Sequence, residues 1–192
     1  MSEFAIAEGL AADLDSSFEA LVGELQDAVF TAALRWSGNR HAAEDIAQET
    51  FLRAYSALGR YPPGRVRELR LRPWLLAIAL NVFRNELRGA GRRPVTRPLA
   101  DHDLGIATDG RGAGAGSNAG VGDLASALVQ ALPDEQRVAV VLRHVIGLDY
   151  DEIAEILGRP SGTVKAQVSR ALRRLRDELT TSERNDEMEV RR

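Results

Sequence analysis

The C-terminal part of the chain combines basic residues with a spacing that suits DNA recognition. Residues 158–176 contain five arginines, Lys165 and no acidic residue. At about 100° per residue, the large apolar side chains fall on one helix face, opposite Ser169, Arg170 and Arg173. A cation-rich helix that begins just after a tight turn is typical of a recognition helix in the DNA major groove. The alternative is a solvated basic face without a ligand, which the Gly158/Gly162 turn makes less favoured.

A second basic block suggests contact with unpaired nucleic acid. Residues 51–97 contain eleven arginines against Glu68 and Glu86. Aromatic side chains can stack on exposed bases while cations follow the phosphate backbone. The residues that could do so are Tyr61, Arg65, Arg67, Arg70, Arg72, Trp74, Arg84 and Arg88, with Asn81 as a base-reading amide or a surface residue. The alternative for Trp74 is packing in the core.

An acidic segment between them contains Glu44, Asp45, Gln48 and Glu49. Carboxylates four residues apart can bind a metal in a helical bundle, but such sites also need Glu-x-x-His pairs on facing helices. None of the three histidines, His41, His102 and His144, is so placed. Glycine-rich phosphate loops and hydrolase nucleophile motifs are also absent from the sequence. We therefore expect a protein-binding acidic face, with no catalytic site, metal or cofactor.

Composition excludes several classes of protein. The 192 residues carry a formal net charge of −3 and no cysteine, which excludes disulfide scaffolds and thiolate zinc sites. No run approaches the roughly 18–20 apolar residues of a membrane helix, and residues 1–14 do not resemble a signal peptide. We expect a soluble cytoplasmic protein. The net charge hides strong segregation, because residues 1–50 contain ten acids and only two arginines.

The elements that must position these residues are all helices. The prediction is an all-α chain of two small helical domains joined by a flexible Gly-rich linker, the second a helix-turn-helix domain. Its parts are a first domain (1–93), a linker (94–122), a second domain (123–180) and a disordered tail (181–192). Expected helices begin at a Ser16/Glu19 capping box and span 42–58, 74–87, 123–131, 133–146, 150–157 and 163–179. Phe51, Leu52 and Tyr55 are interpreted as part of an inward-facing stripe.

Several motifs resemble one protein family. HAAEDIAQETFLRAY (41–55) and RPWLLAIALN (72–81), continued by NELR (85–88), are similar to region 2 of extracytoplasmic-function sigma factors of bacterial RNA polymerase. LPDEQR (132–137), GLDYDEIAEILG (147–158) and GTVK (162–165) resemble their region 4. The motifs occur in the family's order along both domains.

The resemblance implies an alternative sigma factor, which is not an enzyme. It would bind core RNA polymerase, recognise the −35 and −10 promoter elements and promote DNA melting. Asp45, Gln48 and Glu49 would bind the β′ clamp helices, and region 4 would bind the β flap. The implied −10 contacts are Tyr61, Arg70, Arg72, Trp74, Asn81, Arg84 and Arg88, and the −35 contacts are Lys165, Gln167, Ser169, Arg170 and Arg173. Anti-sigma proteins are common partners in this family.

Two features leave alternatives open. Ala166 and Gln167 replace the Ser-Arg pair that is frequent in the family, so the −35 sequence cannot be transferred from relatives. The second domain alone also fits a stand-alone helix-turn-helix regulator of the quorum-sensing-response type. A metal-dependent helical enzyme is a third class.

Overall fold

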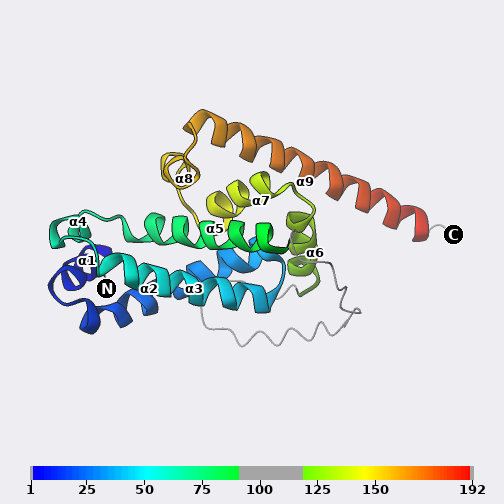
Figure 1. Cartoon of the computed structure of the whole chain (residues 1–192). Coiled ribbons are helices and arrows are strands. Elements are labelled where there is room, and N and C mark those ends of the chain that lie inside the picture. Colours follow the sequence, from blue (N-terminus) through cyan, green and yellow to red (C-terminus); the bar gives the residue numbers. More distant parts are fainter. Residues whose placement is uncertain (1, 91–118, 191–192) are drawn as a thin grey trace.

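The computed structural model describes residues 2–90 and 119–190, and within them every regular element is helical (Figure 1). The first group comprises α1 (Glu3–Ala12), α2 (Leu14–Ser37), α3 (Arg40–Leu58), α4 (Pro63–Arg67) and α5 (Leu71–Ala90). The second comprises α6 (Ala119–Gln130), α7 (Asp134–Val140), the π-helical η1 (Val141–Val145), α8 (Tyr150–Leu157) and α9 (Ser161–Val190). The all-α prediction is confirmed. Of the predicted linker, 94–118 lies outside the described residues, and 119–122 belong to α6.

The first long helix starts earlier than the sequence analysis predicted. Asp13, not Ser16, caps α2, and its carboxylate accepts hydrogen bonds from the Ser16 amide (3.2 Å) and hydroxyl (2.6 Å). Asp13 holds an extended backbone between α1 and α2, which is the usual N-cap conformation. The predicted cap at Ser16 was therefore wrong, because Asp13, three residues earlier, already caps the helix.

The arginine-rich segment between α3 and α5 is an ordered turn. Pro63 opens the short helix α4, and Val66 buries its side chain in the core. Helix α1 packs along α4, and Glu8 pairs with Arg67 at 3.1 Å. This contact fixes the segment that leads into α5.

Helix α5 occupies the centre of the molecule. Its inner residues are Leu71, Leu75, Leu76, Ala79, Leu80, Val82 and Phe83, all buried. Helices α2 and α3 pack on one side of α5 and α8 packs on another, so α5 lies between the two groups (Figure 1). The N-terminal domain and the C-terminal domain thus share one helix as a packing surface.

The second group contains the expected helix-turn-helix. Asp149 and Glu152 form the predicted capping box of α8, and Gly158 ends that helix in a left-handed conformation with φ 62°. Helix α9 follows directly. It continues to Val190, beyond the predicted end at Leu179. No glycine or proline follows Gly162, and nothing in the sequence therefore stops the helix.

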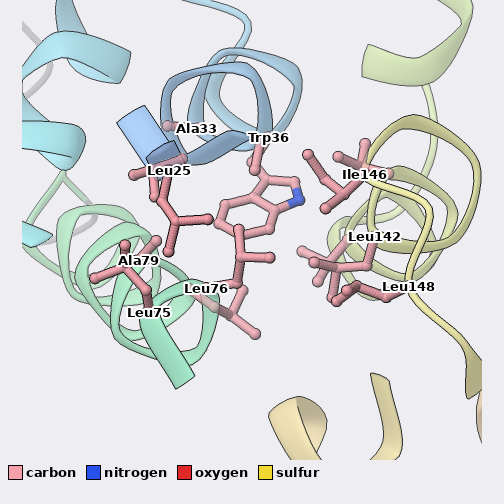
Figure 2. Close-up of a cluster of buried hydrophobic side chains, with 14 of the residues drawn as sticks. Leu25, Ala33, Trp36, Leu75, Leu76, Ala79, Leu142, Ile146 and Leu148 are labelled. Atoms are coloured by element: carbon pink, nitrogen blue, oxygen red, sulfur yellow. The ribbon is translucent and has the colours of Figure 1, made fainter. Parts of the chain in front are cut away.

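One aromatic residue joins the two groups. Trp36, near the end of α2, has no exposed surface. Figure 2 shows its indole with Leu25, Ala33, Leu75 and Ala79 on one side and Leu142, Ile146 and Leu148 of the second group on the other. Phe83 adds a tilted ring contact at 5.8 Å. The hydrophobic core is consequently continuous from α2 to η1.

We expect Trp36→Ala to lower the free energy of unfolding by about 3–5 kcal/mol, the usual cost of emptying a buried aromatic site. Urea denaturation followed by circular dichroism measures it. Leu52→Ala is the control, because Leu52 is 66% exposed and a surface truncation should cost less than about 0.5 kcal/mol. Equal losses in the two variants would contradict the central role of Trp36.

Candidate nucleic-acid and polymerase interfaces

Helix α9 presents a basic surface at its N-terminal half. Lys165, Ser169, Arg170 and Arg173 are exposed, while the apolar residues Val164, Val168 and Ala171 are buried beneath them. Lys165 lies over the Tyr150 ring, 5.5 Å from its centroid. The arrangement leaves four polar or charged side chains free to enter a groove while the helix stays fixed to α7 and α8.

Gln167 differs from the other predicted −35 residues. It is 6% exposed, and its amide donates a hydrogen bond to Glu135 of α7 at 3.2 Å. Its side-chain oxygen is buried and has no partner among the described residues. In this conformation the Gln167 side chain is buried against the protein, whereas the side chains of Lys165 and Arg170 are exposed.

Glu135 holds Gln167 through a larger network. Arg159, in the turn between α8 and α9, donates hydrogen bonds to both Glu135 carboxylate oxygens, one of them at 2.8 Å. This bond lowers the pKa of the Glu135 carboxyl, and it raises the pKa of Arg159. The ion pair ties the first turn of α7 to the helix-turn-helix, because Glu135 and Arg159 lie on those two segments.

The residues predicted to contact the −10 element gather along α5 and the segment before it. The rings of Tyr61 and Trp74 lie 6.3 Å apart and are both partly buried, and Arg65 stacks 4.0 Å over Tyr61. Trp74 also lines a cleft of about 340 Å³ between α5 and α8. Asn81 and Arg88 follow Trp74 at seven-residue intervals and are exposed, so the three share one face of α5.

Two other arginines of this set, Arg70 and Arg72, contact the second domain, and Arg84 lies near charged residues of that domain. Arg70 forms an ion pair with Glu152 and lies 3.6 Å from Glu155. Arg72 donates a hydrogen bond to the Ile146 carbonyl at 2.8 Å. Burial, followed by repulsion from Arg159, lowers the pKa of Arg84, while nearby Glu135 acts in the opposite direction.

Helix α3 carries an exposed acidic and apolar surface. Asp45 and Gln48 are exposed, and Glu49 pairs with Arg53 at 2.6 Å. Leu52 and Tyr55, interpreted from the sequence as inward-facing, are 66% and 42% exposed, so that interpretation was wrong. The buried stripe of α3 is formed by Ala43, Ile46, Thr50, Ala54 and Leu58. Leu52 is therefore a candidate binding residue that its apolar spacing in the sequence did not indicate.

The geometry agrees with what comparison with known proteins shows. The model for Sigma-70 region 2 matches residues 21–93, and that for Sigma-70, region 4 matches residues 123–175. The RNA polymerase sigma-H factor of Pseudomonas aeruginosa is 31% identical over 162 residues, which cover 81% of this chain and 82% of the relative. The chain belongs to the extracytoplasmic-function (ECF) sigma factors. This family supplies promoter-recognising subunits for transcription initiation, which are DNA-binding factors and not catalysts.

Other relatives support the assignment. The ECF sigma factor SigE of Mycolicibacterium smegmatis is 36% identical over 163 residues, 85% of this chain and 62% of SigE. The present sigma factor therefore spans less than two thirds of SigE. Because both regions match in order, a stand-alone quorum-sensing-type regulator no longer accounts for the chain.

Solved structures show the same fold. The sigma factor RpoE of Bartonella quintana, in complex with the anti-sigma factor NepR, gives a TM-score of 0.67 at 25% identity, over 85% of this chain and 96% of RpoE. CnrH, in complex with the cytosolic domain of CnrY, gives 0.68 at 23% identity, over 93% and 97%. In the described part of this sigma factor, no helix has the length and apolar character needed to cross a membrane.

We expect Gln167→Ala to lower the free energy of unfolding by about 1 kcal/mol, since it removes a buried side chain and its partly buried hydrogen bond to Glu135. Ser169→Ala, on the exposed face of the same helix, should change it by less than about 0.5 kcal/mol. Thermal and urea unfolding of both variants measure the difference. A Gln167→Ala protein as stable as the wild type would show that the contact with Glu135 does not support the domain.

Proposed function

We propose that this sigma factor binds core RNA polymerase through the exposed face of α3 and binds promoter DNA through α5 and α9. The observation that carries the proposal is the separation of the surfaces. Helix α3 lies on the other side of α5 from α8 and α9 (Figure 1), and the residues Asp45, Gln48 and Leu52 of α3 and the basic residues of α9 are exposed. Separate surfaces allow one chain to hold the enzyme and the DNA at once.

The polymerase surface would consist of Asp45, Gln48, Glu49 and Leu52, at helical spacing on α3. Leu52 would supply the apolar centre, because a large exposed apolar side chain loses unfavourable contact with water when a partner covers it. The carboxylates around it favour a basic partner surface, and the β′ clamp helices are the partner that the family implies. Region 4 would in the same way contact the β flap.

The −10 surface would consist of Tyr61, Arg70, Arg72, Trp74, Asn81, Arg84 and Arg88. Aromatic rings at the start of α5 would stack on unpaired bases, and the arginines would hold the phosphates. Asn81 is exposed near the middle of α5, where an amide can pair with a base edge. The open strand would therefore lie along α5.

The −35 surface would consist of Lys165, Ser169, Arg170 and Arg173, with Gln167 reaching DNA only if its bond to Glu135 breaks. Arg170 lies at the centre of the exposed face, and its Nε bonds to the Ala166 carbonyl at 3.1 Å within the same helix. A guanidinium in this position can pair with guanine N7 and O6 in the major groove. We infer that Arg170 contributes to base selection and Lys165 to phosphate binding.

An anti-sigma protein would be a further partner, as NepR is for RpoE of Bartonella quintana. The place of action would be the cytoplasm, where RNA polymerase works. No cofactor enters the proposal.

Run-off transcription tests the proposal. Purified core polymerase with genomic promoter fragments should yield new transcripts when this sigma factor is added. Asp45→Arg with Glu49→Arg should weaken core binding at least about tenfold, because it reverses the charge of the α3 surface. Glu3→Arg with Asp27→Arg is the matched control, since both acids are exposed elsewhere in the first domain. No new transcript, or equal core binding by the two double variants, would contradict the proposal.

Base selection by Arg170 has its own test. Arg170→Ala should cost about 1–3 kcal/mol at the cognate −35 element and relax specificity at one base pair. Arg174→Ala is the control, because it removes the same charge from a neighbouring exposed position. The measurement compares transcription from promoters with the cognate and substituted −35 elements. An unchanged ratio in Arg170→Ala would contradict a base-reading role.

A further inference from the structure

Arg65 differs from the other arginines of the turn between α3 and α5. Four of the arginines in this turn bind oxygen atoms of the protein, and these are Arg60, Arg67, Arg70 and Arg72. The Arg65 side chain is exposed, and within the part of the chain that the structure describes its guanidinium has no hydrogen bond or ion pair. Its donor groups are therefore available to a partner outside the chain.

The contact that Arg65 does make is with the ring of Tyr61. The guanidinium carbon lies 4.0 Å from the ring centroid, a distance at which the planar cation stacks on an aromatic face. The Tyr61 ring in turn lies 6.3 Å from the ring of Trp74. Both rings are partly buried, whereas Arg65 is exposed. A base that approaches this face of Tyr61 from solvent therefore meets the guanidinium before it meets the ring.

Helix α4 anchors the backbone that carries Arg65. Pro63 presets the first turn of this short helix. The residue after Arg65 is Val66, whose side chain is buried. Helix α1, with its own buried apolar face, packs along α4 (Figure 1). Because the backbone is held from both sides, little ordering of the protein is needed when a ligand binds Arg65.

A guanidinium plane is suited to an unpaired base. Bases that have left a duplex are bound by stacking on aromatic rings or on guanidinium planes. The N–H groups at the edge of the same plane can donate hydrogen bonds to a phosphate oxygen. An ammonium group carries the same charge but has no plane on which a base can stack.

We propose that Arg65 is a base-contacting residue of the −10 surface, on whose guanidinium one unpaired base of the open strand stacks. Tyr61 is the positioning residue that orients this guanidinium. The inference rests on the proposed binding of the open strand along α5. It deepens that proposal, because it makes a guanidinium the outer layer of the stacking surface and the Tyr61 ring its support.

The first test measures strand binding by Arg65 variants. The probe is a fluorescent single-stranded oligonucleotide with the −10 sequence of a promoter that gives a run-off transcript, and the protein is the full chain with saturating core polymerase. Arg65→Ala should bind the strand at least about fivefold more weakly, as expected for the loss of one stacked base. Arg65→Lys should remain at least about threefold weaker than the wild type, because it restores only the charge.

Arg60→Ala is the matched control for this test. It removes another exposed guanidinium from the same turn, one that already bonds to Ser56, and it should bind the strand as the wild type does. Fluorescence anisotropy measures all affinities. Full binding by Arg65→Lys, or equal losses in Arg65→Ala and Arg60→Ala, would overturn the proposal.

The second test separates base stacking from phosphate contact. Oligonucleotides in which one −10 base at a time is replaced by an abasic site keep every phosphate. At the position that Arg65 contacts, the abasic strand should bind the wild type and Arg65→Ala equally, because the base that stacks is missing. If the two proteins differ by the same factor at every abasic position, Arg65 binds only phosphates and the proposed stacking is wrong.

The positioning role of Tyr61 requires a double-mutant cycle. In a Tyr61→Leu background, Arg65→Ala should weaken strand binding by less than about twofold, because the guanidinium has already lost its support. In a Tyr61→Phe background the same change should again cost about fivefold, since the remaining ring keeps the cation–π contact. Equal costs in the two backgrounds would show that Tyr61 does not orient Arg65. The first two tests do not depend on the folding of the Tyr61→Leu variant.

The outcomes separate this inference from the proposed function. If the wild-type holoenzyme transcribes and binds the strand, and Arg65→Ala binds it equally well, the inference is wrong and the proposed function stands. If the wild-type holoenzyme gives no promoter-dependent transcript, the proposed function is wrong and the inference falls with it. A loss in Arg65→Ala that disappears when one particular base is removed supports both.

Discussion

The C-terminal turn of α2 is the point on which the relation of the two domains depends. Trp36 fills the space between α5 and η1, and the carbonyl groups of Arg35 and Trp36 accept hydrogen bonds from the second domain. Gly38 permits this approach because it adopts φ 67° and because any Cβ would collide with Gln130. A single turn thus ends a helix, completes a hydrophobic core and orients the second domain over α5.

Two kinds of interaction, ion pairs and apolar burial, hold the two domains together. Exposed ion pairs contribute about 0–1 kcal/mol each, so the pair of Arg70 with Glu155 adds little to the strength of this contact. Burial of the Trp36 ring contributes more, because it removes a large apolar surface from water. The arginines instead determine which surface is covered. The contact between the domains is therefore mainly apolar in strength, and the arginines add specificity of position.

Local signals in the sequence predicted local structure well and long-range contacts poorly. The Asp149/Glu152 capping box and the helix-turn-helix depend on neighbouring residues, and both could be predicted from spacing. Leu52 was assigned inward because apolar residues at helical spacing usually face a core, but here the side chain is 66% exposed. The resemblance assigned Gln167 to DNA. Its burial in the structure depends on Glu135, 32 residues earlier, and no local sequence pattern indicates that contact. Trp36 gave no signal, because part of its burial comes from Leu142, Ile146 and Leu148 in the other domain.

Contacts between acidic and basic segments change the interpretation of the net charge of −3. From the sequence, the acidic segment around Asp45 and Glu49 is expected to bind a protein partner. In the structure, Glu135 binds Arg159 near Arg84, and Glu152 binds Arg70, so some acidic residues of the second domain pair directly with arginines of the basic blocks. Phosphates and these carboxylates compete for the same guanidinium groups, and salt weakens both interactions.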